Sequence, residues 1–267
     1  MKRNADTIKG PIKTFLGRSI YGPRLHQLLL GNAAVIVTFH RVNNIAGGDG
    51  LTCSVEGFER YCRFFANYFN VLSLRDLIGK IESGAPLNGD LAITFDDGYR
   101  DNYQFAAPLL KTFGLPATFF VVSQFIGTEF VQWWDRNLSV PQTWMTWDEV
   151  RFLHCEGFEI GAHSRTHANL GEACEEKARE EIFGSRFELE DRLSTPVDLF
   201  AYPYGRENHI SEENREIVKA AGFRCCCSCF GGVNGRGTDP FHLRRISISS
   251  WYESPPHFGF DVALRRA

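Results

Sequence analysis

Two short motifs carry carboxylates and imidazoles in a pattern that could hold a metal ion and use it for hydrolysis. Asp96 and Asp97 stand in TFDDG (Thr94–Gly98), directly after an apolar run and before a glycine. His163 and His167 stand four residues apart in HSRTH. Two adjacent carboxylates at a strand end repel one another unless a cation or a hydrogen bond separates their roles. One carboxylate and two imidazoles leave a coordination position open for water, as hydrolytic metal sites do.

Each motif taken alone has an ordinary structural explanation. Asp-Asp-Gly is typical of a turn that ends a strand, and two histidines four apart match one face of a surface helix. Gly161 before the histidines and Asn169 after them favour a loop over a helix. A third motif, FAYPYG (Phe200–Gly205), is an apolar strand that ends in a Pro-Tyr-Gly turn. The three motifs in this order, each at the end of a strand, favour a site over three unrelated turns.

Together the motifs resemble the polysaccharide deacetylases of carbohydrate esterase family four, which share the NodB-homology fold. The resemblance implies an α/β fold, a distorted (β/α) barrel of about seven parallel strands. It also implies hydrolysis of N-acetyl groups on an amino sugar of a poly- or oligosaccharide, with release of acetate. The matching segments are TFDDGYRDN (Thr94–Asn102), PATFFV (Pro116–Val121), EIGAHSRTH (Glu159–His167) and FAYPYG (Phe200–Gly205).

The same resemblance implies roles for single residues. Asp96 matches the catalytic base, and Tyr204 matches the residue whose backbone N–H helps to hold the oxyanion. The metal ligands of the family match Asp97, His163 and His167. Zn²⁺ is the expected metal for this set of nitrogen and oxygen ligands, and Co²⁺, Mn²⁺, Fe²⁺ and Ni²⁺ suit the same set.

The first departure from the family pattern concerns the arginine that pairs with the base. In the family this arginine stands two places before the proline of the third motif, where this chain has Ala201. We expect Arg245, near the end of the last predicted strand, to take its place, with Arg100 as the second candidate. The missing arginine is also the one feature that favours a catalytically impaired barrel that binds glycans without turnover.

The second departure concerns the general acid. No Leu-x-His ending is clear near the C-terminus, where most members carry the acid histidine. The early apolar strand Ala33–Phe39 ends in His40, which resembles rearranged members in which a histidine after the first strand takes this role. His242 is the competitor, but it lies inside an alternating pattern that favours a structural or surface position.

Aromatic residues near the motifs are candidates for contact with a sugar. Trp133 and Trp134 lie in the long loop Gln124–Thr143. Exposed aromatic rings stack on sugar faces, while buried rings serve packing, and the sequence leaves both alternatives open. With Tyr204 and Arg245, these tryptophans make up the expected substrate contacts.

Length, composition and charge allow one large α/β domain. A chain of 267 residues, 43% of them hydrophobic, can bury a substantial core. The formal net charge of −3 comes without the basic stripe that is typical of nucleic-acid binders. No apolar run approaches the roughly 20 residues of a transmembrane helix. No signal-peptide core follows the N-terminal Met-Lys-Arg.

Four of the eight cysteines crowd one short segment, at Cys225, Cys226, Cys227 and Cys229. Such a run invites scrambled disulfides in an oxidising compartment, so we expect a cytoplasmic protein. The cysteines could form a soft-metal site, but adjacent cysteines cannot all face one ion from a strand, which favours small apolar strand residues. A cytoplasmic enzyme at the inner face of the membrane would act on precursors of surface polysaccharide.

Strands and helices alternate along the chain, which predicts a parallel sheet with crossover helices. Residues 1–32 are expected to form a helical extension, and residues 33–267 the barrel domain. Residues 8–31 have the pattern of one or two basic amphipathic helices, which could pack on the domain or make peripheral contact with a membrane. The expected strands are Ala33–Phe39, Ala92–Phe95, Ala117–Val122, Phe158–Ile160, Leu199–Tyr202, Phe223–Cys227 and His242–Ile248.

The carboxyl ends of parallel strands meet at one end of a barrel, where reactive groups gather. The expected catalytic and metal-binding residues all stand at such ends, in agreement with the resemblance. A rival activity within the enzymes is O-deacetylation, or hydrolysis of another amide. The sequence does not predict the oligomeric state.

Overall fold

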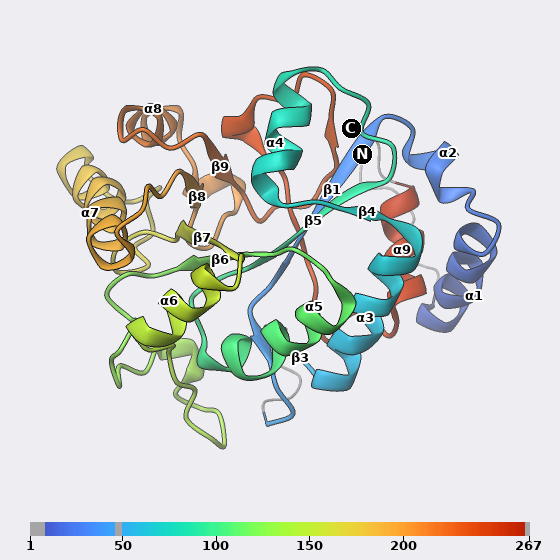
Figure 1. Cartoon of the computed structure of the whole chain (residues 1–267), viewed down its shortest axis with the longest axis horizontal. Helices are drawn as coiled ribbons and strands as arrows, with labels where there is room; N and C mark the ends of the chain where they lie inside the picture. Colours follow the sequence, from blue (N-terminus) through green and yellow to red (C-terminus); the bar gives the residue numbers. More distant parts are fainter. Residues whose placement is uncertain (1–8, 46–49, 265–267) are drawn as a thin grey trace.

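The structure is a computed structural model that describes residues 9–45 and 50–264. Its centre is a curled, mostly parallel sheet that forms a half-barrel of seven strands (Figure 1). The strands run in the order β11-β1-β5-β6-β7-β8-β9, each parallel to its neighbours. They are β1 (Ala33–Phe39), β5 (Asp90–Phe95), β6 (Thr118–Val121), β7 (Glu159–Ala162), β8 (Leu199–Ala201), β9 (Cys225–Cys227) and β11 (Ile246–Ser247).

Short strands pair with the beginnings of β1 and β5, and another pair lies beyond the end of β1. β10 (Asn234–Gly235) pairs antiparallel with the start of β1, and β4 (Asn70–Val71) pairs with the start of β5. β2 (Arg41–Val42) and β3 (Thr52–Cys53) form a separate pair beyond the end of β1. A bridge between Cys227 and Leu243 brings β9 beside the segment that enters β11, so the two edges of the half-barrel approach one another.

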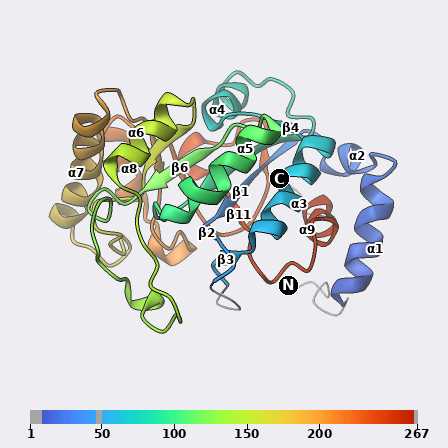
Figure 2. The ribbon, with the colours of Figure 1, turned by 60° about the horizontal axis from the view of Figure 1, so that its bottom comes forward.

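Helices cover the outside of the sheet, and α1, α2 and α9 gather along one edge of the molecule (Figures 1 and 2). A π-helical turn at Asn102–Ala106 precedes α5. The helices are α1 (Gly10–Tyr21), α2 (His26–Leu30), α3 (Val55–Tyr68), α4 (Leu74–Glu82), α5 (Ala107–Phe113), α6 (Trp147–Cys155), α7 (Glu175–Leu193), α8 (Glu212–Ala220) and α9 (Pro255–Ala263).

The strands alternate between the inside of the barrel and the helical layer, as the two-residue period of a strand requires. On β1, Ala34 and Ile36 belong to an inner cluster, whereas Val35, Val37 and Phe39 pack towards the helices. α4 contributes four apolar side chains to the inner cluster, so it fills the barrel interior at the end where β1 and β5 begin. These side chains are Leu74, Leu77, Ile78 and Ile81.

The cysteine-rich segment follows the same alternation. Cys225 and Cys227 belong to the inner cluster, and Cys226 packs on the other side of β9. All three are buried and free of disulfides. They serve as small apolar strand residues, and among the described residues the cysteines form no group of metal-binding size.

One expected strand is much shorter in the structure. The predicted strand His242–Ile248 is wrong over most of its length, because a 3₁₀ turn, Pro240–His242, occupies its first residue and regular pairing begins only near its end. Oδ1 of Asp239 accepts a hydrogen bond from the backbone N–H of Phe241 and caps this turn. Only Ile246–Ser247 is a strand.

The predicted helical segment 8–31 forms two helices, which pack on α9. Gly17 of α1 touches the backbone of Pro256, so that a Cβ at this position would lie 1.9 Å from a carbonyl oxygen. Lys13 forms an ion pair with Asp261. Residues 1–8 of the expected extension lie outside the described residues. No helix in the described part of the chain is both long and apolar enough to cross a bilayer.

Candidate active site

The register between β1 and β5 brings the first two site residues together. Phe39 pairs with Phe95, so His40 and Asp96 follow side by side at the ends of neighbouring parallel strands. Both continue the inward-facing rows of their strands, since Thr94 on β5 lies two residues before Asp96. Both side chains line one cleft of about 710 Å³.

Asp97, His163 and His167 form a buried group at the bottom of this cleft. One ligand atom from each of the three lies within 4.8 Å of the others. Oδ1 of Asp97 is 3.4 Å from Nε2 of His163 and 3.2 Å from Nε2 of His167. Among the described residues, this carboxylate oxygen has no hydrogen-bond donor. A buried carboxylate oxygen without a donor is costly, so the geometry fits a cation between the three side chains.

The tautomer of His163 supports the same interpretation. Its Nδ1 lies 2.9 Å from the carbonyl oxygen of Ala201, which can only accept a hydrogen bond. Nδ1 therefore carries the proton, and in the neutral ring Nε2 presents a lone pair towards Asp97. A hydrogen bond of this kind orients a metal-binding histidine in many proteins. Ala201, where the family has its arginine, thus contributes its backbone to the site.

A buried glutamate holds the loop that carries the two histidines. Glu181 of α7 accepts hydrogen bonds from the backbone N–H groups of Arg165 and Thr166 and from the Thr166 hydroxyl, at 2.6 to 3.0 Å. Its side chain is fully buried. Because it fixes the backbone between His163 and His167, it sets the spacing of the two imidazoles.

Unusual backbone conformations concentrate at the site. Six non-glycine residues of the described chain have a positive φ, and four of them belong to the three motifs. A positive φ is costly for such residues and persists where surrounding contacts enforce it. The four are Asp97 (75°), Ser164 (59°), His167 (60°) and Tyr204 (59°).

Arg245 binds Asp96 from inside the barrel. Its Nη1 and Nη2 donate to Oδ1 and Oδ2 of Asp96 at 2.7 and 2.8 Å, a bidentate pair with both side chains buried. Nε donates to the carbonyl oxygen of Ser228, and Nη1 also donates to the hydroxyl of Thr94. All three guanidinium nitrogens therefore have protein partners, and Arg245 is buried and does not line the cleft, where substrate contact was expected. Arg100 pairs with Glu149 instead.

These charges set the protonation of the two aspartates. Burial alone would raise the pKa of Asp96, but Arg245, His163 and His40 oppose it and hold the pKa below its ordinary value. Burial opposes ionisation of Asp97 too, and the imidazoles of His163 and His167, when they carry a proton on Nε2, hold its pKa well below the ordinary value. Both carboxylates are therefore ionised near neutral pH, one available as a base and one as a ligand.

His40 completes the polar wall of the cleft. Burial lowers its pKa, and the charges of Asp97 and Asp96 act in the opposite direction. Asn102 donates a hydrogen bond of 2.8 Å to the backbone carbonyl of His40 and fixes the chain where β1 ends. His242 lies on the surface beside Asp239, outside the residues that line the cleft.

A sequence profile of the Polysaccharide deacetylase family matches residues 84–226, more than half of the chain. The chain belongs to the polysaccharide deacetylase family. The matched segment contains Asp96, Asp97, both site histidines and Tyr204. His40 and Arg245, the two residues in rearranged positions, lie outside it.

Known proteins agree with this assignment. The deacetylase is 24% identical over 216 residues to YxkH of Bacillus subtilis (strain 168), a protein provisionally assigned as a polysaccharide deacetylase, with 80% of this chain and 71% of YxkH covered. Streptococcus pyogenes deacetylase PplD, solved in complex with acetate, superposes with a TM-score of 0.71 at 19% identity and covers 85% of this chain and 96% of PplD. IcaB from Ammonifex degensii gives 0.71 at 20% identity, covering 88% and 98%. These two structures share the fold.

Aromatic rings of the deacetylase surround His167. The ring centroids of Trp134 and Tyr204 lie 4.9 and 4.7 Å from that of His167. Trp133 is 60% exposed and Trp134 is partly buried, and both line the cleft. Trp134 is held from behind, because its indole N–H donates to the hydroxyl of Tyr99 at 2.8 Å.

Two groups that support the site of the deacetylase were not identified from the sequence. Glu181 looks like any other acid of the charged helix α7, and only its burial distinguishes it. The second group joins Tyr99 to Asp135, whose carboxylate accepts the tyrosine hydroxyl at 2.8 Å and forms a buried ion pair with Arg41. Asp135 directly follows Trp133 and Trp134 in the sequence. Its position next to these two candidate substrate contacts was the one signal that could have identified it.

Proposed function

We propose that the protein is a metal-dependent deacetylase that hydrolyses N-acetyl groups on an amino sugar of a poly- or oligosaccharide and releases acetate. One observation carries the proposal: a buried carboxylate oxygen of Asp97 faces two imidazoles without a donor, next to a second carboxylate, Asp96, held by Arg245. The first group suits a cation, and the second suits a base. Family membership makes acetyl transfer to water the reaction to test first.

Asp97, His163 and His167 would hold the metal. Their donor set, one oxygen and two nitrogens, suits Zn²⁺ as the leading candidate, and Co²⁺, Mn²⁺, Fe²⁺ or Ni²⁺ would fit the same atoms. A bound divalent ion would supply Lewis acidity to water and to the acetyl carbonyl.

The remaining residues have complementary tasks. Asp96, ionised and oriented by Arg245, takes a proton from the attacking water. The backbone N–H of Tyr204, which makes no hydrogen bond among the described residues, donates to the oxyanion that forms on the acetyl carbon. His40, beside Asp96, gives a proton to the departing amine, because an amine anion is a poor leaving group.

The bidentate pair between Arg245 and Asp96 weakens the argument for a glycan-binding module without turnover. The only argument for such a module was that Ala201 stands where the family has its arginine. O-deacetylation uses the same base and the same metal, but it does not need a protonated leaving amine. The discriminating experiment measures acetate release from matched N-acetylated and O-acetylated sugars. We expect the wild type to release acetate from the N-acetylated sugars, and we expect this turnover to depend on His40. Turnover of the O-acetylated sugars alone would instead make the protein an O-deacetylase.

The location of the enzyme is part of the proposal. The adjacent cysteines Cys225, Cys226 and Cys227, buried as free thiols in β9, support a cytoplasmic enzyme at the inner face of the membrane. Its substrates there would be precursors of surface polysaccharide. Fractionation of cells that express the tagged chain tests this location.

A further inference from the structure

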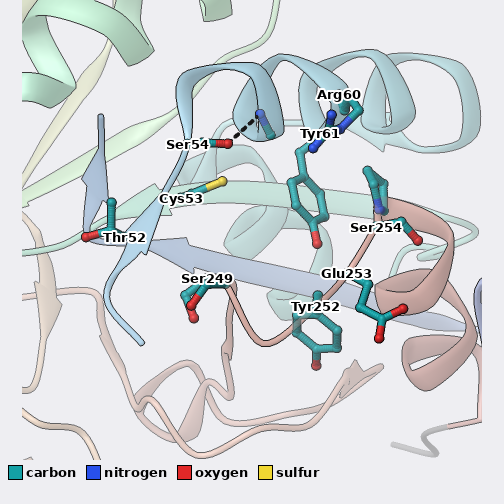
Figure 3. A pocket seen from close by; sticks show the side chains of 12 residues that line it. Thr52, Cys53, Ser54, Arg60, Tyr61, Ser249, Tyr252, Glu253 and Ser254 are labelled. Carbon is teal, nitrogen blue, oxygen red and sulfur yellow. Dashed lines mark hydrogen bonds between the residues drawn. The ribbon is translucent and has the colours of Figure 1, made fainter. Parts of the chain in front are cut away.

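A second cavity, of about 200 Å³, lies beyond one end of the catalytic cleft. It lies between the start of α3 and the segment that leads from β11 into α9 (Figure 3). Tyr252 lines both the cavity and the cleft, and Leu51 of the cleft precedes Thr52 of the cavity. The cavity is therefore a continuation of the cleft.

Two hydroxyls in this cavity are buried without a partner. The side-chain oxygens of Tyr61 and Ser249 make no hydrogen bond among the described residues, although each residue is only 3% exposed. The ring of Tyr61 is part of the core, with its centroid 5.8 Å from that of Phe39 and 5.9 Å from that of Phe258. Figure 3 shows its hydroxyl directed from α3 towards the segment that carries Ser249 and Tyr252.

An unpartnered buried hydroxyl lowers stability, and a phenylalanine would fill the same core position at no such cost. Natural proteins keep costly polar groups mainly where function requires them. Packing explains the ring of Tyr61 but not its hydroxyl. A bound ligand that hydrogen-bonds to this hydroxyl would explain why the residue is a tyrosine.

The other lining groups define the chemistry of that ligand. They are rich in hydroxyls, of which those of Thr52, Ser54 and Ser254 already hydrogen-bond within the protein. They also include one cation and one anion, Arg60 and Glu253, so they favour a neutral molecule with several hydroxyl groups over an ion. The volume is below the range of whole-ligand pockets and suits a single ring. The lining hydroxyl residues are Thr52, Ser54, Tyr61, Ser249, Ser250, Tyr252 and Ser254.

We propose that this cavity binds one neutral sugar ring of the glycan, at a distance from the ring that loses its acetyl group. The inference rests on the proposed function, since it assigns the cavity to the same substrate. It makes the enzyme selective for oligosaccharides long enough to reach from the metal ligands past Tyr252.

The test compares Tyr61→Phe and Ser249→Ala with the wild type on N-acetylglucosamine and N-acetylgalactosamine oligosaccharides of one to five units. For the longer substrates each variant should raise KM about tenfold, the effect of one lost hydrogen bond, with kcat unchanged. The shortest substrates should not respond. Tyr61→Phe should also raise the midpoint of thermal unfolding. Tyr68→Phe, on the same helix but outside the cavity, is the matched control.

Equal KM values for short and long substrates in the wild type, or an unchanged KM in both variants, would overturn the inference. Equal losses on substrates of every length would assign Tyr61 to the fold alone. If the wild type releases no acetate from any substrate, the proposed function fails. Calorimetry with the uncleaved oligosaccharides then tests separately whether the cavity binds a sugar ring. In that case length-dependent binding that weakens in Tyr61→Phe supports the inference, and its absence contradicts it.

An independent observation concerns the surface of α1 and α2, which follow one another along one edge of the molecule (Figures 1 and 2). Their inner faces pack on α9, but five large apolar side chains point outward. Phe15 is 68% exposed and Leu28 is 81% exposed. The five are Ile12, Phe15, Leu25, Leu28 and Leu29.

The charged side chains that the α1–α2 segment contributes are all basic, and the acidic groups beside it, Glu253 and Asp261, come from the segment of α9. Residues 7–32 contain no aspartate or glutamate, while Lys9, Arg18 and Arg24 are exposed. The chain as a whole has a net charge of −3, so this basic edge is a local feature. Apolar side chains flanked by basic ones are typical of helices that lie in the headgroup region of a bilayer.

We infer that the α1–α2 edge docks on an anionic membrane surface. Wild-type protein should co-sediment with vesicles of phosphatidylcholine that contain about 30% phosphatidylserine, and much less with phosphatidylcholine alone. The double variant Phe15→Ser/Leu28→Ser should lose most of this binding. Phe187→Ser removes a phenylalanine that is 73% exposed on the acidic helix α7, and should bind like the wild type.

Failure of the wild type to bind anionic vesicles, or equal binding by the double variant, would overturn this assignment. A wild-type dimer that the double variant converts to a monomer, without vesicle binding by either, would assign the edge to a second copy of the chain.

Discussion

Arg245 and Asp96 meet through two hydrogen bonds of 2.7 and 2.8 Å, although 149 residues separate them in the sequence. The pair restores from a different strand the base–arginine contact that Ala201 cannot make. It orients the carboxylate and favours its ionised form.

Replacing Arg245 by methionine should raise the pKa of Asp96. Burial already opposes ionisation of this carboxyl, and Arg245 is the first of the charges that outweigh it. A base works when it is deprotonated, so the acidic limb of the kcat/KM profile should move to higher pH. Arg100→Met, which breaks only the pair with Glu149, should leave the limb in place. If the acidic limb of the kcat/KM profile stays in place in Arg245→Met, the Arg245–Asp96 pair does not set the pKa of the base.

Asp96→Asn should keep the metal and lose most turnover. Asparagine preserves the shape of the side chain and removes its basicity, and general base catalysis typically contributes about 10²–10⁴-fold. Metal content by elemental analysis and acetate release on the same sample check both halves. Metal loss as severe as in Asp97→Ala would make Asp96 a ligand instead.

His40→Ala should lower turnover by about 10²-fold or more and flatten the alkaline limb of the pH profile, because the proton donor for the amine is gone. Bound metal should remain. His242→Ala, a surface histidine, should leave turnover and profile nearly unchanged. If His242→Ala is inactive while His40→Ala keeps its turnover, the histidine that follows β1 is not the general acid.

Asp101 should make the protein less stable as the pH rises from about 4 to about 6. Burial raises its pKa from 3.8 to about 6, although Asn43 and Asn102 donate hydrogen bonds to it. The native state therefore binds a proton that the unfolded chain has lost in this window, and the free energy of unfolding falls by up to about 3 kcal/mol. Urea unfolding of metal-free protein at both ends of the window, compared with Asp101→Asn, measures this effect. Equal pH slopes for the two proteins would exclude it.

The strands were predictable where their residues are apolar throughout. The predicted strand Ala33–Phe39 has the bounds of β1, because its seven residues are buried on both faces and leave no other interpretation. The last strand was overestimated. Arg245 was expected only as a substitute arginine near the end of that strand, and the structure shows that it faces inward, two residues after the inward-facing Leu243.

The supports of the site could not be read from the sequence in the same way. Glu181 acts because α7 packs against the histidine loop, and Asp135 acts because the loop Gln124–Thr143 folds back on Tyr99. Both depend on the approach of segments far apart in the chain. No local pattern distinguishes a buried carboxylate from an exposed one in such segments.

Metal removal tests the central claim most directly. Wild-type protein stripped with a chelator should release no acetate from N-acetylated oligosaccharides, and one equivalent of Zn²⁺ per chain should restore turnover in proportion to the metal bound. Asp97→Ala and His163→Ala should neither retain the ion nor recover, since each lacks one of three protein ligands. His209→Ala, which alters the cleft but not the buried group, should recover like the wild type. Full activity of the stripped wild type, or stoichiometric zinc in Asp97→Ala, would contradict the account.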